Sequence, residues 1–202
     1  MKCGDEHQNL KASCYIRVGI PVKPMLAKPT KGVNIVLERF DGIEFTCEYK
    51  YDGFRGQIHF DRSMESKGKD CHIYSRNLEN MSVAYPDVLT IIREVSNEKE
   101  NLNNFILDAE LVAYDTEHNM ILPFSMMTQR SRKHVTEKDL KTKICIMAFD
   151  ILYLNDKSLL EETFAERRRH LHEYFGEIKG KFMFAVSTDT SSFEDLQKFL
   201  DE

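Results

Sequence analysis

Polar and apolar side chains alternate along residues 43–50 and again along residues 54–60, a pattern typical of half-buried β-strands. In the first segment Lys50 shares its face with two glutamates and a threonine, opposite the apolar positions. The dipeptide Asp52-Gly53 between the segments is a hairpin-type turn signal. The pattern therefore predicts two strands joined by a tight turn, with Lys50 at the end of the first strand.

Two longer segments, residues 105–114 and 144–154, are the most apolar stretches of the chain. Their length and composition suit strands at the centre of a sheet. Residues 71–76 and residues 181–188 show shorter patterns of the same kind. We therefore expect a sheet with two central strands and several shorter ones around them.

Apolar residues recur at helical spacing over residues 33–40, 86–95 and 193–200. Residues 163–166, TFAE, form a capping box for a further helix that runs to about Phe175. Strands predominate, neighbouring strands are expected to be antiparallel, and the helices are scattered between them. This order of elements predicts an α+β fold.

The composition excludes several classes of protein. A chain of 202 residues with 42% hydrophobic residues can bury a sizeable core. It has no apolar run long enough for a transmembrane helix, and its start does not have the pattern of a signal peptide. Its five cysteines include no C-x-x-C pair. We therefore expect reduced thiols in the cytosol or nucleus, rather than a disulfide framework or a zinc site.

The net charge of −5 does not by itself favour a nucleic-acid partner. Residues 130–143 nevertheless hold six lysines or arginines against two acidic residues, and Arg167, Arg168 and Arg169 follow one another in a predicted helix. Charge runs of this kind are usually solvated faces. Each run alone is therefore weak evidence for a polyanionic partner.

Lys50 allows an ordinary and a chemical interpretation. A lysine in a strand is usually a solvated, outward-facing residue. A strand end beside a tight turn also suits a nucleophilic amine, because the backbone is held while the side chain projects. Such an amine must be neutral to attack, whereas a free lysine titrates at about 10.4. Burial, or a nearby cation such as Arg55 or a metal ion, would favour the neutral form.

Asp108 and Glu110 share one face of the apolar segment 105–114. Two carboxylates on a buried strand are costly unless they are paired or bound to a metal ion. One possibility is a Mg²⁺ site, because Mg²⁺ takes carboxylate ligands. The other is a buried salt bridge to Arg55 or Arg76. The residues alone leave these two alternatives equally open.

The segment EYKYDGFRGQIH, residues 48–59, is similar to the signature of covalent nucleotidyltransferases, which is lysine-x-Asp-Gly-x-x-Arg or the same pattern with one fewer spacer. Here it reads Lys50-Tyr51-Asp52-Gly53-Phe54-Arg55. That group comprises ATP-dependent DNA ligases, RNA ligases and mRNA capping enzymes. Residues 19–202 resemble the adenylation domain of ATP-dependent DNA ligases of the eukaryotic DNA ligase I type. Further segments that carry the resemblance, in the family's order, are PVKPMLAKPTKG (21–32), IYSRNLE (73–79), YPD (85–87), FILDAELVAYD (105–115), PFSMMTQRSRK (123–133) and AFDILYLN (148–155).

The resemblance implies an ATP-grasp-like nucleotidyltransferase domain with mainly antiparallel sheets flanked by helices. It implies that residues 1–18 are a linker or the remnant of an upstream DNA-binding domain, and that residues 19–202 are the N-terminal part of the adenylation domain. The family's E-G-x-x-x-K motif and its oligonucleotide-binding-fold domain do not occur in the 202 residues. We therefore expect a domain incomplete at its C-terminus, which alone seals no nicks and adenylates itself poorly. We also expect a monomer, with association through an unpaired sheet edge as a possible departure.

The resemblance also assigns roles to residues. Lys50 is the nucleophile that takes AMP from ATP, and Glu48 reads the adenine edge. Arg55 contacts the nucleotide and the 5′-phosphate of the nicked strand. Glu110 holds the ribose or the catalytic Mg²⁺. Phe149 stacks on the adenine, whereas without the resemblance it would be a core phenylalanine.

Residues with an expected role toward DNA lie elsewhere. Arg76 serves phosphate binding, and Ser131, Arg132 and Lys133 match a segment that contacts the DNA backbone. Residues 167–169 are expected to remain a solvated helix face.

The expected function is therefore that of an ATP-dependent DNA ligase of the nucleus. It would transfer AMP through a lysine to the 5′-phosphate of nicked double-stranded DNA in replication, repair and recombination, with Mg²⁺ as cofactor and without membrane association. One alternative is an RNA ligase or capping guanylyltransferase, which labelling with ATP or GTP separates. An NAD-dependent ligase is disfavoured because no segment resembles its nicotinamide-binding region. The last alternative is a non-catalytic relic that only binds nucleotide or DNA.

Overall fold

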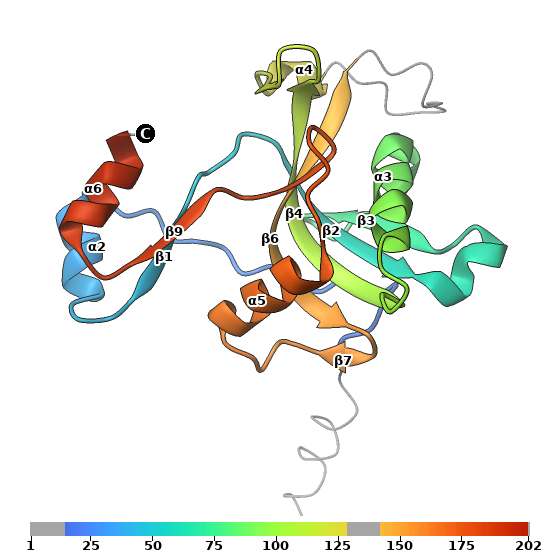
Figure 1. Cartoon of the computed structure of the whole chain (residues 1–202), viewed down its shortest axis with the longest axis horizontal. Coiled ribbons are helices and arrows are strands. Elements are labelled where there is room, and N and C mark those ends of the chain that lie inside the picture. The colour runs from blue at the N-terminus through green and yellow to red at the C-terminus, as the bar shows by residue number, and fades with distance from the viewer. Residues whose placement is uncertain (1–14, 129–141, 202) are drawn as a thin grey trace, which may run out of the picture. The chain divides into compact units, whose positions relative to one another are not determined.

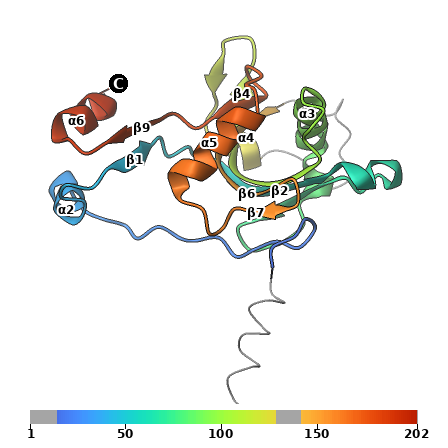
Figure 2. The same ribbon diagram turned by 60° about the horizontal axis from the view of Figure 1, so that its bottom comes forward.

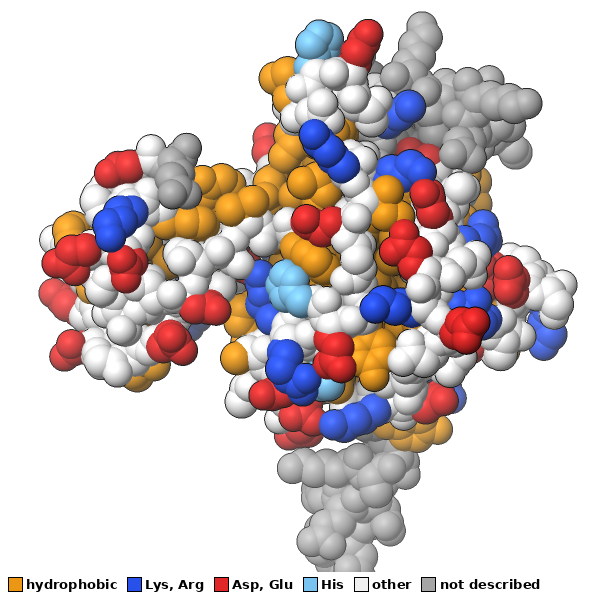
Figure 3. All heavy atoms as spheres, in the orientation of Figure 1, with side chains coloured by type: hydrophobic (Ala, Val, Ile, Leu, Met, Phe, Trp, Pro, Cys, Tyr) orange, Lys and Arg blue, Asp and Glu red, His pale blue; other side chains and the backbone are white. Residues whose placement is uncertain are grey.

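The computed structural model describes residues 15–128 and 142–201 (Figure 1), and Figure 3 shows their side chains in the same orientation. Their contacts divide the chain into two compact units that interleave along the sequence. The first unit takes the residues up to Lys23 together with Asp52–Phe184, and the second takes Pro24–Tyr51 together with Ala185–Glu202. Each unit is described by itself below.

Among the described residues, the first unit forms a seven-stranded sheet in the order β3-β2-β4-β6-β7, with β5 on β4 and β8 on β6. All pairs are antiparallel except the parallel pair of β6 and β8. The predicted central strands, which are β4 and β6, are confirmed. The strands are β2 Phe54–Asp61, β3 Cys71–Ser75, β4 Asn104–Asp115, β5 Met120–Ile121, β6 Lys143–Leu154, β7 Lys157–Ser158 and β8 Phe182–Phe184.

Helices α3 and α5 both contact β6 and bury apolar residues in one core cluster with the sheet (Figure 2). As predicted, α5 begins with a cap, because the Thr163 hydroxyl accepts a hydrogen bond from the Glu166 backbone N–H. The core consists mainly of β2, β4 and β6 side chains together with Val88, Ile92 and Leu171 from these helices. The helical segments of this unit are η1 Arg62–Lys67, η2 Ser82–Ala84, α3 Pro86–Asn97, α4 Ser125–Thr128 and α5 Phe164–Tyr174.

A buried polar cluster attaches the stretch before residue 23 to the first unit. The backbone N–H of Gly19 donates to Nδ1 of His59 at 3.0 Å, and the Tyr74 hydroxyl donates to the Gly19 carbonyl at 2.9 Å. The Gln57 amide bonds both the N–H and the C=O of Val22, at 2.9 and 3.0 Å. Nε2 of His59 donates to Oε1 of Gln57 at 2.9 Å, so the ring is held in one neutral tautomer. The role of residues 1–18 as a linker stays a prediction.

The second unit consists, in the described ranges, of a two-stranded antiparallel ladder with two helices. Strand β1, Phe45–Glu48, pairs with β9, Ser187–Thr190, so that Glu48 lies opposite Ser187. Helix α2 spans Val33–Arg39 and α6 spans Phe193–Asp201, which confirms both predicted helices.

The predicted hairpin around Asp52-Gly53 is wrong. Strand β1 pairs with β9, more than a hundred residues away, whereas β2 pairs with β3 and β4. Gly53 meets a packing requirement instead, because a Cβ there would collide with the carbonyl oxygen of Leu111. Residues 181–188 also differ from expectation, since they divide into β8 and β9 in different sheets.

The sequence also led to expectations about membrane-spanning helices and about cysteines, and both concern residues in the described part of the chain. No helix within it is long and apolar enough to cross a membrane. Cys47, Cys71 and Cys145 are free thiols.

Candidate active site

The two residues that flank Lys50 both form hydrogen bonds with Val186, Tyr49 through its backbone and Tyr51 through its side chain. Strand β1 ends at Glu48, so Lys50 lies two residues beyond the strand rather than at its last position. The Tyr49 N–H donates to the Val186 carbonyl at 3.0 Å, and the Val186 N–H donates to the Tyr51 hydroxyl at 3.2 Å. Both Glu48 and Lys50 are exposed. The arrangement presents an exposed amine on a chain fixed at its two flanking residues.

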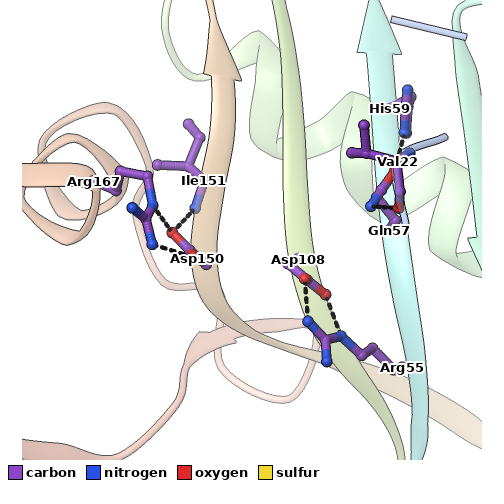
Figure 4. A network of polar contacts seen from close by, with 8 residues as sticks. All are labelled: Val22, Arg55, Gln57, His59, Asp108, Asp150, Ile151 and Arg167. Atoms are coloured by element: carbon purple, nitrogen blue, oxygen red, sulfur yellow. Dashed lines mark hydrogen bonds and ion pairs between the residues drawn. The ribbon is translucent and has the colours of Figure 1, made fainter. Parts of the chain in front are cut away.

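Arg55, on β2 of the first unit, forms a bidentate ion pair with Asp108 on β4 (Figure 4). Its Nε lies 2.9 Å from one carboxylate oxygen and its Nη2 lies 2.6 Å from the other. Asp108 is 4% exposed, so its carboxylate is almost completely desolvated. The salt bridge that the sequence left open is therefore confirmed for Asp108, with Arg55 as its partner.

The pKa values of the two groups in this ion pair are shifted by different causes. The hydrogen bond to Asp108 raises the pKa of Arg55, so its guanidinium stays charged. Burial raises the pKa of Asp108, and the hydrogen bond from Arg55 opposes that rise. The pair thus fixes a permanent cation in a partly buried position.

Glu110 and Phe149 lie around this cation. In the sheet register Glu110 on β4 is directly opposite Arg55 on β2. The guanidinium carbon of Arg55 lies 5.4 Å from the centre of the Phe149 ring, within range of a cation–π contact. Glu110 and Phe149 are each half-buried. The first unit therefore brings together a cation, a carboxylate and an aromatic ring.

The remaining predicted residues lie in other parts of the chain. Arg76 is exposed in the turn that follows β3, where the Ser75 hydroxyl accepts hydrogen bonds from the N–H groups of Asn77 and Glu79. Ser131, Arg132 and Lys133 lie outside the described residues.

The sequence did not predict the ion pair between Arg167 on α5 and Asp150 on β6 (Figure 4). Arg167 was expected on a solvated face, but its side chain is only 18% exposed, and Arg168 is buried. Of the three arginines, Arg169 is the solvent-exposed one and pairs with glutamates of its own helix. The sequence did contain a signal for the burial of Arg168, because Arg168 and the buried Leu171 are three residues apart and so share a helix face.

A group of possible metal ligands within the described residues lies at the turn between β4 and β5. The ligand atoms of Asp115, Glu117 and His118 all lie within 4.8 Å of one another. The Asp115 carboxylate is already bonded to two backbone N–H groups and to the His118 ring. Glu110, the predicted Mg²⁺ ligand, does not belong to this group.

Comparison with known proteins agrees with these features. The family model described as ATP dependent DNA ligase domain matches residues 24–202. The chain is 47% identical over 193 residues to DNA ligase 1 of Arabidopsis thaliana, covering 96% of the chain and 24% of that protein. It is 45% identical over 196 residues to DNA ligase 1 of Saccharomyces cerevisiae, covering 96% of the chain and 25% of that protein. The chain thus spans about a quarter of the length of these relatives.

The fold has a counterpart among solved structures. A mycobacterial DNA ligase D complexed with ATP and MES superposes with a TM-score of 0.51 at 22% identity. The match covers 71% of this chain and 40% of that one. The predicted α+β nucleotidyltransferase fold, with antiparallel sheets flanked by helices, is confirmed.

Proposed function

Because the chain belongs to the ATP-dependent DNA ligase domain family, we propose that it carries the adenylation step of nick sealing, with Lys50 as the nucleophile. The observation that carries this proposal is the gathering of Arg55, Glu110 and Phe149 on neighbouring strands. These three side chains supply a cation, a carboxylate and a ring, which suit the phosphate, the ribose or metal ion, and the base of a nucleotide.

The reaction proceeds in three displacements at phosphorus. The neutral amine of Lys50 attacks the α-phosphorus of ATP, pyrophosphate leaves, and the amine loses a proton to form a phosphoramidate. A 5′-phosphate oxygen at the nick then attacks the same phosphorus, and AMP passes to the DNA as the lysine amine departs with a proton. Finally the adjacent 3′-hydroxyl attacks the 5′-phosphorus and releases AMP, which closes the strand.

Individual residues take the following roles toward the nucleotide in this proposal. Phe149 stacks on the adenine, Glu48 accepts a hydrogen bond from its edge, and Glu110 binds the ribose or Mg²⁺. Arg55 faces developing phosphate charge with a guanidinium that Asp108 keeps oriented. Glu110 would hold a bound Mg²⁺, which would supply further positive charge at the phosphates of ATP.

The DNA partner is a nicked duplex, contacted through phosphates by Arg76, Ser131, Arg132 and Lys133. Because relatives named DNA ligase 1 come from eukaryotes, we propose that the protein acts in the nucleus, in replication, repair and recombination. If Arg132 and Lys133 contact phosphates, their double alanine variant lowers the slope of log affinity against log salt by about one unit per lost contact. An unchanged slope would indicate that Arg132 and Lys133 lie on a solvated face and do not contact DNA phosphates.

The proposal is tested with a chimera in which residues 24–202 replace the matching segment of the S. cerevisiae DNA ligase 1. The chimera and the 202-residue chain are incubated with α-labelled ATP and Mg²⁺, and nicked DNA is then added. We expect the label on the chimera and its transfer to the 5′ end at the nick. Labelling by GTP instead would indicate a capping-type enzyme. Absence of label, with the unmodified yeast ligase active, would indicate a non-catalytic relic.

A further inference from the structure

Phe149 occupies a bulge in the longest pairing of the sheet. Asp150 pairs with Asp108 and Ala148 pairs with Ala109, so that Phe149 has no partner on β4. A bulge bends its strand and re-aims the side chain of the extra residue. This local irregularity directs the ring of Phe149 to its position 5.4 Å from the Arg55 guanidinium carbon.

The residue after the bulge is fixed by helix α5. Nε and Nη2 of Arg167 donate to the two carboxylate oxygens of Asp150 at 2.8 and 2.9 Å. One of these oxygens also accepts the N–H of Ile151 at 2.8 Å (Figure 4). The two side chains are 18% and 14% exposed, so water screens the pair little. Asp150 is therefore bonded both to the helix and to its own strand.

The side chain of Arg167 is itself held by a further hydrogen bond, so it can fix the position of Asp150. Nη1 of Arg167 donates to the Glu162 carbonyl at 2.9 Å, just before the helix begins. The next residue, Arg168, donates to the carbonyl of Phe149 at 3.4 Å. Two consecutive arginines of α5 thus hold the backbone of the bulge residue and the side chain that follows it.

We infer that Arg167 is a positioning residue that, through Asp150, holds the β6 bulge and with it the ring of Phe149. The inference rests on the proposed function, in which this ring stacks on the adenine. A buried ion pair is often no more stabilising than apolar residues of the same volume, whereas it can specify one arrangement. The bidentate geometry suits such a role, because Arg167 fixes both oxygens of Asp150 and hence the direction of the strand after Phe149.

The chain contains no tryptophan, so Phe149→Trp places a single tryptophan in the bulge, and its emission can be excited selectively over that of the eight tyrosines. Arg167→Met is compared with Arg169→Met in this background. The control removes the same charge from an exposed position on the same helix, where Arg169 pairs with Glu166 and Glu173. We expect Arg167→Met to raise quenching of the tryptophan by acrylamide about twofold, Arg169→Met to leave it unchanged, and Arg167→Lys to fall between, because lysine lacks the planar fork.

All variants are measured below their unfolding temperatures, with far-UV circular dichroism as the check on folding. Equal quenching in Arg167→Met and Arg169→Met would overturn the inference. If Arg167→Met does not fold, Arg167→Lys tests the inference. Quenching in Arg167→Lys equal to that of the parent would show that the bidentate contact does not hold the ring.

A second readout separates this inference from the proposed function. In the chimera, with Phe149 restored, Arg167→Met should raise the KM for ATP in lysine adenylation about tenfold, consistent with partial loss of one base stack, while Arg169→Met should not. Changed quenching in the 202-residue chain without any effect on KM would leave the positioning of Phe149 intact and count against adenine stacking. Unchanged quenching with a raised KM would count against the positioning role alone.

Discussion

The two units of the molecule are stabilised to very different degrees. The first has a wide sheet in whose long strands β4 and β6 most residues are buried, with α3 and α5 completing its core. The second has a ladder of four-residue strands, and its buried apolar side chains within the described residues are Phe45, Ala185, Leu196 and Phe199. None of the seven residues of α2 is buried. A short ladder of this kind is marginal without such support.

The residues with proposed roles in the reaction differ in how heavily their surroundings are packed. Arg55, Glu110 and Phe149, which are proposed to hold the nucleotide, lie in the heavily packed unit, whereas Glu48 and Lys50 lie in the lightly packed one. A binding residue benefits from a rigid element, because its position costs no ordering when the ligand arrives. The lightly packed unit should open locally at a much lower free energy than the other.

The largest expected effect is a difference in amide hydrogen exchange between the two sheets. Amides in β4, such as that of Leu107, should be protected about a thousandfold more than those of β1, such as that of Thr46, because opening β1 exposes little apolar surface. The measurement is hydrogen exchange of the chain with peptide-level mass spectrometry. Equal protection of β1 and β4 would show that the two units open together and would remove the basis of the comparison.

A core truncation should affect one unit more than the other. Leu107 has no exposed surface, so Leu107→Ala should lower the opening free energy of β4 by about 3 kcal/mol. Leu196→Ala, in α6, should speed exchange in α6 and leave that of β4 unchanged. The same exchange experiment reports both variants, and a loss of protection in β4 caused by Leu196→Ala would contradict the independence of the units.

Acid should weaken the first unit through His59. Burial, together with the smaller effect of the neighbouring His72, lowers the pKa of this histidine to about 3 from its usual 6.5. Because the folded pKa is lower than the unfolded one, this contribution is complete above pH 6.5 and is lost as the pH falls toward 3. Between pH 7 and pH 5 the unfolding free energy of the first unit should fall by about 2 kcal/mol because of His59 alone.

The check is urea unfolding of the chain and of His59→Gln at both pH values. His59→Gln removes the titrating ring, so the unfolding free energy of this variant should fall by about 2 kcal/mol less than that of the parent between pH 7 and pH 5. His118→Gln, at a ring that is 70% exposed, serves as the control and should keep the parent's dependence on pH. A parent whose stability does not change over this range would show that protonation of His59 does not oppose folding.

The sequence predicted most of the elements because their signals are local. The two central strands follow from continuous apolar runs, and the start of α5 follows from the side chain of Thr163. The partner of β1 could not be predicted in this way, since β9 lies far along the chain and the Asp52-Gly53 signal favoured a hairpin. Gly53 instead accommodates the Leu111 carbonyl, a contact that no local pattern reveals.

The sequence likewise predicted some features of the candidate site and missed others. The ion pair of Asp108 was one of two alternatives that the alternation of β4 allowed. The bulge at Phe149 was not foreseen, because it depends on a change of register between two strands rather than on the residues AFD themselves. The buried position of Arg167 was missed for a related reason, since its partner Asp150 lies on another element.

The central claim, that Lys50 is the residue that accepts AMP, is tested most directly by peptide mapping. The chimera is incubated with ATP and Mg²⁺, digested and analysed by mass spectrometry, alongside Lys50→Ala and the exposed control Lys198→Ala. We predict AMP on the peptide that contains Lys50, its disappearance in Lys50→Ala and its persistence in Lys198→Ala. An adduct on a different lysine, or undiminished labelling of Lys50→Ala, would contradict the account.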